Sequence, residues 1–269
     1  MGKIIAVANQ KGGVGKTTTV VNIAAYLGSR GFKVLCIDCD PQGNSTTGFG
    51  IRKKELSVST YDVIIGKSRI QDALVKTEFE NVSIAGATEN LAGCEIELAS
   101  AENRVNRLKM QVLNCKEDFD YIFIDCPPAL GTITINALVA CDRVLVPMLA
   151  EFYALEGLSQ LYNTIKIVKN NYNPNLDLEG ILFTMFDPRL NVSNDVVKEV
   201  EKYFPDKVFE TKIPRNVRLS EAPSHGKPIM YYDRSSKGAE SYELVCHEML
   251  GEPLVIKKKR RGLCSFGKS

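Results

Sequence analysis

The sequence lacks tryptophan and has only two histidines, His225 and His247, among 269 residues. A metal site built from histidine is therefore not expected, and Mg²⁺ held by oxygen ligands is the alternative. No apolar run approaches the roughly 20 residues that a bilayer-spanning helix needs. The N-terminal apolar run is short and has no small-residue cleavage site, which indicates a strand rather than a secretory signal. We expect a cytoplasmic protein without stable membrane insertion.

Paired cysteine motifs are also missing. The eight cysteines include no CxxC pair, and five of them lie in or beside apolar segments. This distribution favours buried, reduced thiols over a metal site or disulfides. A strong charge excess is absent as well, because the formal net charge is only +2. Any affinity for nucleic acid must then come from locally clustered basic residues.

Short β-branched runs recur along the chain, separated by polar stretches with helical character. Runs that are apolar on both faces are typical of parallel strands covered by helices on both sides. The pattern predicts a single-domain α/β fold with a doubly wound, mostly parallel sheet. The predicted strands are KIIAVA (3–8), KVLCID (33–38), YIFID (121–125), RVLVPML (143–149), GILFTMF (180–186) and VFETKIP (208–214).

Two helices and a tail complete this outline. Apolar residues at helical spacing predict a helix from Thr17 to Arg30, ended by Gly31, and a second helix is expected over 235–250. Residues 52–110 are predicted to be mixed helix and loop without chemical motifs. We expect one domain over 1–253, followed by a basic, weakly ordered tail over 254–269.

The stretch NQKGGVGKTTT (9–19) lies between the first strand and the first helix. Gly15, Lys16 and Thr17 fit the end of the phosphate-binding loop pattern, whereas Gln10 replaces its first glycine. In such loops backbone N–H groups surround phosphate oxygens, the lysine reaches the outer phosphates, and the hydroxyl binds Mg²⁺. Strand, loop and helix follow in the order that a phosphate site requires.

A second lysine, Lys11, precedes the expected one, and KGGVGKTT resembles the deviant Walker A motif of the ParA/MinD group of P-loop ATPases. The resemblance implies that ATP binding forms a homodimer in which Lys11 reaches the nucleotide of the other subunit. One cation per site would leave much of the negative charge of the triphosphate unneutralised in a poorly hydrated interface. The simpler alternative is an ion pair between Lys11 and a nearby carboxylate. The implied nucleotide contacts are Lys11, Gly12, Gly13, Val14, Gly15, Lys16, Thr17 and Thr18.

Acidic residues follow two predicted strands. Asp125 ends YIFID in the Walker B position, while Asp38 ends VLCID and Asp40 lies just beyond it. The resemblance implies that Asp40 polarises the attacking water and that Asp38 supports it. With Lys11 and Lys16, Asp40 forms the expected catalytic set, and Thr17, Asp38 and Asp125 form the expected metal set. A lone strand-end aspartate could instead cap a helix or form a turn.

The remaining resemblance is long and lies closest to the short chromosomal ParA proteins of the Soj branch. It runs through DCDPQGNSTTGFG, IDCPPALGTITINAL and TMFDPR to IPRNVRLSEAPSHGKPI. In the last segment, Pro214 and Asn216 match positions that face adenine. The chain begins directly at the P-loop strand, without the helix-turn-helix extension of larger plasmid relatives. The resemblance therefore implies non-specific binding of double-stranded DNA, through Arg189, Arg215 and Arg218.

The implied function is a DNA-partitioning cycle at the nucleoid. The ATP dimer binds DNA, and a ParB-type centromere-binding protein stimulates hydrolysis and release. The alternative within the fold is a MinD-like membrane-cycling ATPase. The tail carries five basic residues, 257–261, but only Leu263 and Phe266 as large apolar side chains after them, which is too few for a convincing membrane face. An iron–sulfur carrier, with Cys126 and Cys94 as conceivable ligands, is the alternative from another functional class.

Overall fold

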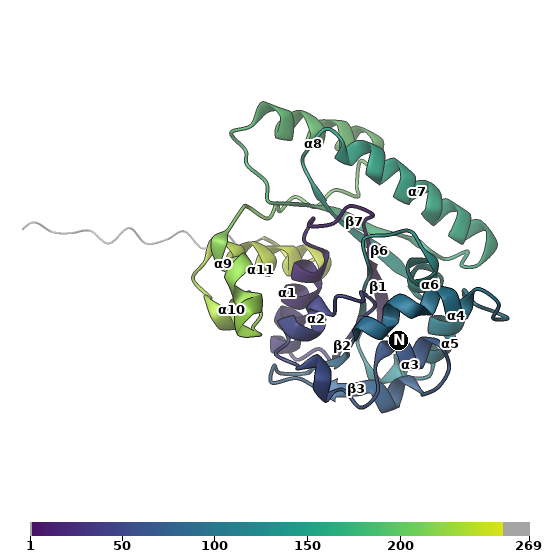
Figure 1. The fold of residues 1–269 in the computed structure, drawn as a ribbon. Coiled ribbons are helices and arrows are strands. Elements are labelled where there is room, and N and C mark those ends of the chain that lie inside the picture. Colours follow the sequence, from purple (N-terminus) through teal and green to yellow (C-terminus); the bar gives the residue numbers. More distant parts are fainter. Residues whose placement is uncertain (1, 255–269) are drawn as a thin grey trace, which may run out of the picture.

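The computed structural model describes residues 2–254, which form one seven-stranded sheet covered by helices on both faces (Figure 1). The strand order is β3-β4-β2-β5-β1-β6-β7, and only the β3–β4 pair is antiparallel. The expected doubly wound, mostly parallel sheet is confirmed. The strands are β1 (Lys3–Val7), β2 (Val34–Asp38), β3 (Leu74–Lys76), β4 (Val82–Ala85), β5 (Tyr121–Asp125), β6 (Arg143–Leu149) and β7 (Asp177–Thr184).

The helices divide between the two faces of this sheet. Alternate residues of one strand point to opposite sides, so that Ile4 and Ile5 belong to separate hydrophobic clusters. The cluster that contains Ile5 also includes side chains of α1, α10 and α11, and the cluster that contains Ile4 includes side chains of α3 to α8. The helices are α1 (Lys16–Ser29), α2 (Asn44–Gly48), α3 (Thr60–Ile64), α4 (Cys94–Leu98), α5 (Arg107–Leu113), α6 (Thr132–Ala140), α7 (Ala154–Asn171), α8 (Asn191–Tyr203), α9 (Val217–Glu221), α10 (Ile229–Tyr232) and α11 (Lys237–Met249).

Both predicted helices form with small shifts at their ends. The first begins at Lys16 and ends at Ser29, and Gly31 follows with φ of 91°. A left-handed residue just beyond a helix is a common terminator, and glycine adopts it without steric cost. The second begins at Lys237, because the Ser236 hydroxyl accepts a hydrogen bond from the Ala239 N–H as an N-cap.

The expected strand over 208–214 is wrong, although the segment does run beside β7. It makes only isolated bridges, Ile181 to Val208 and Phe186 to Pro214. Between them, the N–H groups of Glu210 and Thr211 donate to the Glu248 carboxylate on α11 instead of to β7. Because successive N–H groups of a strand point in opposite directions, a continuous strand would have paired one of these two donors with β7, and the Glu248 side chain takes it instead.

Two strands were missed within residues 52–110, where we expected helix and loop. β3 and β4 are three and four residues long, too short to show a clear period in the sequence. The cysteine prediction is confirmed for the described part of the chain, in which seven cysteines are free and buried. Burial raises the pKa of Cys126 well above its usual range. No group of three or more His, Cys, Asp or Glu within residues 2–254 is arranged around a metal position.

Within that same range no helix is long and apolar enough to cross a membrane. The predicted basic tail lies outside the described residues from position 255 onward. The division into one domain and a tail therefore stays a prediction.

Candidate active site

The glycine loop connects β1 to α1 at the carboxyl edge of the parallel strands. Gly13 and Gly15 have φ of 72° and 84°, a backbone conformation that other residues adopt only with strain. Gly15 precedes α1, whose first turn has neither a side-chain cap nor an acidic residue. The first N–H groups of this 14-residue helix are thus left to an external acceptor. Together with the helix dipole, they suit the oxygens of a phosphate.

Lys16 lies buried beneath the loop at the start of α1. Its Nζ donates to the backbone carbonyl of Lys11 at 3.3 Å. Burial lowers its pKa, and the negative charges of Asp125 and Asp40 oppose that shift. A lysine that loses hydration in this way gains strongly from an anionic ligand, as the sequence prediction requires.

Asp125, at the end of β5, shares one carboxylate oxygen between two hydroxyl donors. Thr17 Oγ1 and Ser45 Oγ donate to its Oδ2 at 2.8 and 2.6 Å. Its Oδ1 is buried without a hydrogen-bond partner among the described residues. Burial, together with the nearby Asp38, raises the pKa of Asp125 to about 7. Because a buried oxygen without a partner is costly, this carboxylate and the Thr17 hydroxyl fit a Mg²⁺ ion held with nucleotide phosphates.

Asp38, at the end of β2, has both carboxylate oxygens engaged by the following segment. Oδ2 accepts the N–H and hydroxyl of Thr46 at 2.8 and 2.7 Å, and Oδ1 accepts the Asp40 N–H at 3.2 Å. Burial raises the pKa of Asp38 to about 6. These contacts make Asp38 an anchor for the loop that carries Asp40, and its role as a metal ligand stays a prediction. Asp40 is buried near Lys16, and its Oδ1 accepts the Gln42 N–H.

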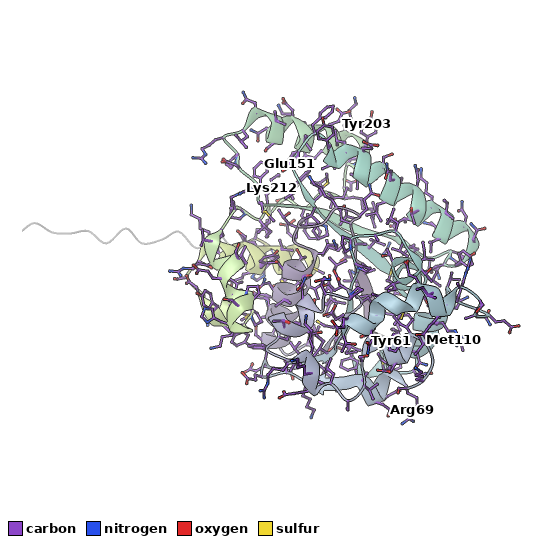
Figure 2. All side chains as sticks on the ribbon, viewed as in Figure 1. Tyr61, Arg69, Met110, Glu151, Tyr203 and Lys212 are labelled. Atoms are coloured by element: carbon purple, nitrogen blue, oxygen red, sulfur yellow. The ribbon has the colours of Figure 1, made fainter. Side chains whose placement is uncertain are left out.

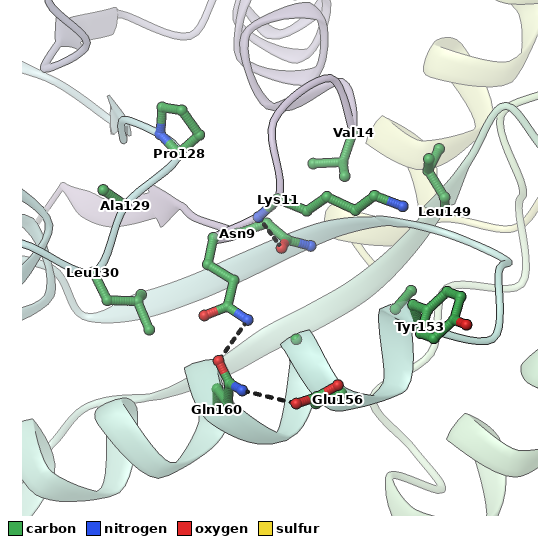
Figure 3. Close-up of a pocket in the computed structure, with 13 residues that line it drawn as sticks. Asn9, Lys11, Val14, Pro128, Ala129, Leu130, Leu149, Tyr153, Glu156 and Gln160 are labelled. Carbon is green, nitrogen blue, oxygen red and sulfur yellow. Dashed lines mark hydrogen bonds between the residues drawn. The ribbon is translucent and has the colours of Figure 1, made fainter.

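Lys11 lies within the glycine loop, and its side chain is partly exposed. Within one chain it makes the ion pair that the sequence left as the simpler alternative, with its Nζ 2.6 Å from Glu151 Oε2. Its backbone N–H donates to the Asn9 side chain (Figure 3). The Asn9 amide in turn donates to the Pro147 carbonyl. Glu151 lies in the short connection between β6 and α7 (Figure 2). Sequence reasoning did not find this glutamate, because it lies 140 positions away.

A cavity of about 250 Å³ lies beside the loop and contains both residues expected at the base. Asn216 Oδ1 caps α9 by accepting the Leu219 N–H at 3.3 Å, which leaves its amide group as a donor. Sequence reasoning gave no role to Met185, although it lies within the matched segment TMFDPR, and missed Tyr242, which no motif marks. The cavity is lined by Gly15, Thr18, Thr184, Met185, Ile213, Pro214, Arg215, Asn216, Leu219, Ser220, Pro223 and Tyr242.

The three arginines expected at DNA are exposed, and all lie after β7. The Arg189 guanidinium donates two hydrogen bonds to the Asp187 carboxylate. Arg218 forms ion pairs with Glu221 and Asp233. Arg189 and Arg215 both help to hold the pKa of Asp187 low, at about 2. The bridge between Phe186 and Pro214 brings their segments together. The structure thus places Arg189 and Arg215 near one carboxylate.

Comparison with known proteins agrees with this site. A family described as an AAA domain matches residues 2–178. The sporulation initiation inhibitor protein Soj of Bacillus subtilis is 54% identical over 90% of this chain and 96% of its own length. The chromosome partitioning protein ParA of Myxococcus xanthus is 48% identical, over 97% of this chain and 92% of its own length.

Solved structures show the same fold. Cobyrinic acid a,c-diamide synthase from Mycobacterium smegmatis, with a bound ATP analogue and magnesium, is 37% identical with a TM-score of 0.81, over 93% of this chain and 94% of its own. The septum site-determining protein MinD of Pyrococcus horikoshii, complexed with Mg-ADP, is 25% identical with a TM-score of 0.75, over 92% and 96%. With its glycine loop, paired strand-end aspartates and these relatives, the chain belongs to the ParA/Soj family of chromosome-partitioning ATPases, which use ATP and Mg²⁺.

Proposed function

We propose that this ATPase partitions DNA by an ATP-dependent change between one copy and two. In the ATP state, two copies face each other across their glycine loops, and each Lys11 reaches the phosphates held by its partner. The observation that carries this proposal is the position of Lys11, at the surface beside two large exposed side chains. Phe152 and Tyr153 are 71% and 79% exposed, next to its ion-pair partner Glu151. Exposed apolar groups that cluster beside a functional loop are typical of an interaction surface.

The contacts within one copy support the catalytic roles that we propose. The N–H groups of the loop and Lys16 bind and orient the phosphates, while Thr17 and Asp125 hold the Mg²⁺, which neutralises phosphate charge. Asp40 accepts a hydrogen bond from the attacking water, and Asp38 keeps Asp40 in place through its N–H. Ser45 orients Asp125 by donating to the oxygen that Thr17 also contacts.

DNA binding is proposed for the exposed arginines after β7: Arg189, Arg215 and Arg218. Contacts of arginine with phosphates carry no sequence information, so the binding is non-specific. Pairing of two copies places two such surfaces on one particle, and binding at both sites is far tighter than binding at one. A ParB-type partner on the centromere then stimulates hydrolysis, which separates the dimer and releases the nucleoid.

The decisive experiment measures DNA retention at low salt with ADP, with a non-hydrolysable ATP analogue, and without nucleotide. Retention only with the analogue is expected, together with synergistic stimulation of the ATPase by DNA and the ParB-type partner. Equal retention in all three states would contradict the proposal. Stimulation by anionic liposomes instead of DNA would favour the MinD-like function.

A further inference from the structure

We propose that Glu151 is a positioning residue that holds Lys11 in the unpaired chain and thereby sets the ATP concentration at which two copies associate. This inference rests on the proposed function, in which Lys11 serves the partner's nucleotide. The contact is direct, because Lys11 Nζ lies 2.6 Å from Glu151 Oε2. A lysine ammonium in a close ion pair must leave it before reaching another anion.

The same loop is held to the same region by a second set of contacts. Gln10 Nε2 donates to Gln160 Oε1 at 2.8 Å, and Gln160 Nε2 donates to Glu156 Oε1 at 3.3 Å (Figure 3). A Cβ at Gly157 would lie only 3.2 Å from the Gln10 amide, so the start of α7 approaches the loop closely. Positions 10 and 11 are both directed toward residues 151–160 of their own chain.

The strength of the ion pair between Lys11 and Glu151 depends on how exposed the two side chains are. The side chains of Lys11 and Glu151 are 42% and 56% exposed, so water and salt screen their attraction. The hold is therefore weak enough for a triphosphate, with several charges, to displace it. Each dimer releases two lysines but also binds two ATP molecules, so each ATP offsets the cost of one ion pair. Measured strengths of exposed pairs correspond to a change of up to about five-fold in the ATP concentration needed for pairing.

The experiment compares Glu151→Gln with Glu156→Gln in the full chain. Both variants remove one negative charge from the same region. Glu156 forms no ion pair with Lys11 within residues 2–254, and its replacement retains an oxygen to accept the Gln160 bond. Dimer formation is measured by light scattering against the concentration of a non-hydrolysable ATP analogue, with Mg²⁺. We expect E151Q to lower the midpoint by roughly two- to five-fold and E156Q to leave it within about 1.5-fold.

The salt dependence of the midpoint is a second measurement, and a general effect of the substitution on folding would not change it. The two proteins differ only at position 151, so the ratio of wild-type to E151Q midpoints reports on the charge of Glu151. That ratio should fall toward one as the salt concentration rises from about 0.05 to 0.5 M.

A direct repulsion between Glu151 and the nucleotide would predict a different result in the Lys11→Ala background. There the glutamate has no lysine to hold, so adding E151Q should leave MgATP affinity unchanged. A gain in affinity there, an equal effect of E156Q, or an unchanged midpoint for E151Q would overturn the inference. The proposed function fails separately, if the Lys11→Ala variant associates with ATP as well as the wild type does.

Discussion

Thr17 on α1 and Asp125 at the end of β5 share a hydrogen bond of 2.8 Å, although 108 positions separate them in the chain. The hydroxyl belongs to the glycine loop and the carboxylate to the Walker B strand, so this bond joins the two halves of the proposed Mg²⁺ site. Ser45 donates to the same oxygen, and the other oxygen is left for a ligand. Burial of this carboxylate also affects the stability of the folded chain.

Asp125 should make the stability of the protein without nucleotide depend on pH. Its pKa is raised from 3.8 to about 7 in the folded state, so the folded chain binds more protons than the unfolded chain between these values. The stability contribution is therefore full below about pH 4 and is lost as pH rises to about 7. In urea titrations with EDTA, the free energy of unfolding of the wild type should fall by roughly 1–3 kcal/mol relative to that of Asp125→Asn over this range. If the difference in unfolding free energy between the two proteins does not change with pH, Asp125 is not a buried, protonated carboxylate.

Asp40→Ala should separate ATP binding from hydrolysis. Within residues 2–254, Asp40 makes no hydrogen bond with the glycine loop, and its removal leaves the Asp38 contacts with Thr46 in place. We expect ATP affinity and ATP-dependent association within about two-fold of wild type, with turnover lowered roughly 10²- to 10⁴-fold, as for other general bases. Single-turnover hydrolysis measures this change directly. Loss of binding together with turnover would place Asp40 in binding instead.

At position 185 a glycine variant should be more stable than an alanine variant, the reverse of the usual order. Met185 has a φ of 48°, where a Cβ is strained, and it lines the base cavity. Both Met185→Ala and Met185→Gly remove the long side chain from the base cavity, but only glycine relieves the backbone. We expect the glycine variant to be more stable than the alanine variant by about 1 kcal/mol. Both should bind ATP a few-fold more weakly, as measured by calorimetry.

Removal of Arg215 should weaken DNA binding without changing sequence preference. Each phosphate that the protein neutralises contributes about 0.9 to the slope of log affinity against log salt, so Arg215→Ala should make that slope shallower by about 0.9 for each phosphate that Arg215 neutralises. Arg69→Ala is the matched control, because Arg69 is also an exposed arginine near an aspartate, here Asp72, but lies at the far end of the molecule (Figure 2). Fluorescence anisotropy in the ATP-analogue state measures both variants. Equal weakening by the two would contradict a specific surface.

Local patterns in the sequence predicted most of the fold. The runs of β1, β2, β5, β6 and β7 are long and apolar enough to identify by themselves, whereas β3 and β4 are too short. The segment 208–214 shows the opposite error. Its composition is that of a strand, but Glu248, from a distant helix, takes two of its N–H groups.

The chemistry of the site divides in the same way. The sequence by itself determined the glycine loop, its lysines and the strand-end aspartates, because their order along the chain carries the requirement for phosphate and Mg²⁺. Only the tertiary structure decided which side chains meet them: Ser45 at Asp125, Glu151 at Lys11, and Met185 and Tyr242 beside Asn216. The physical reason is that the backbone conformation of a loop depends on residues next to it in the chain, whereas these contacts join groups that become neighbours only when the sheet has formed.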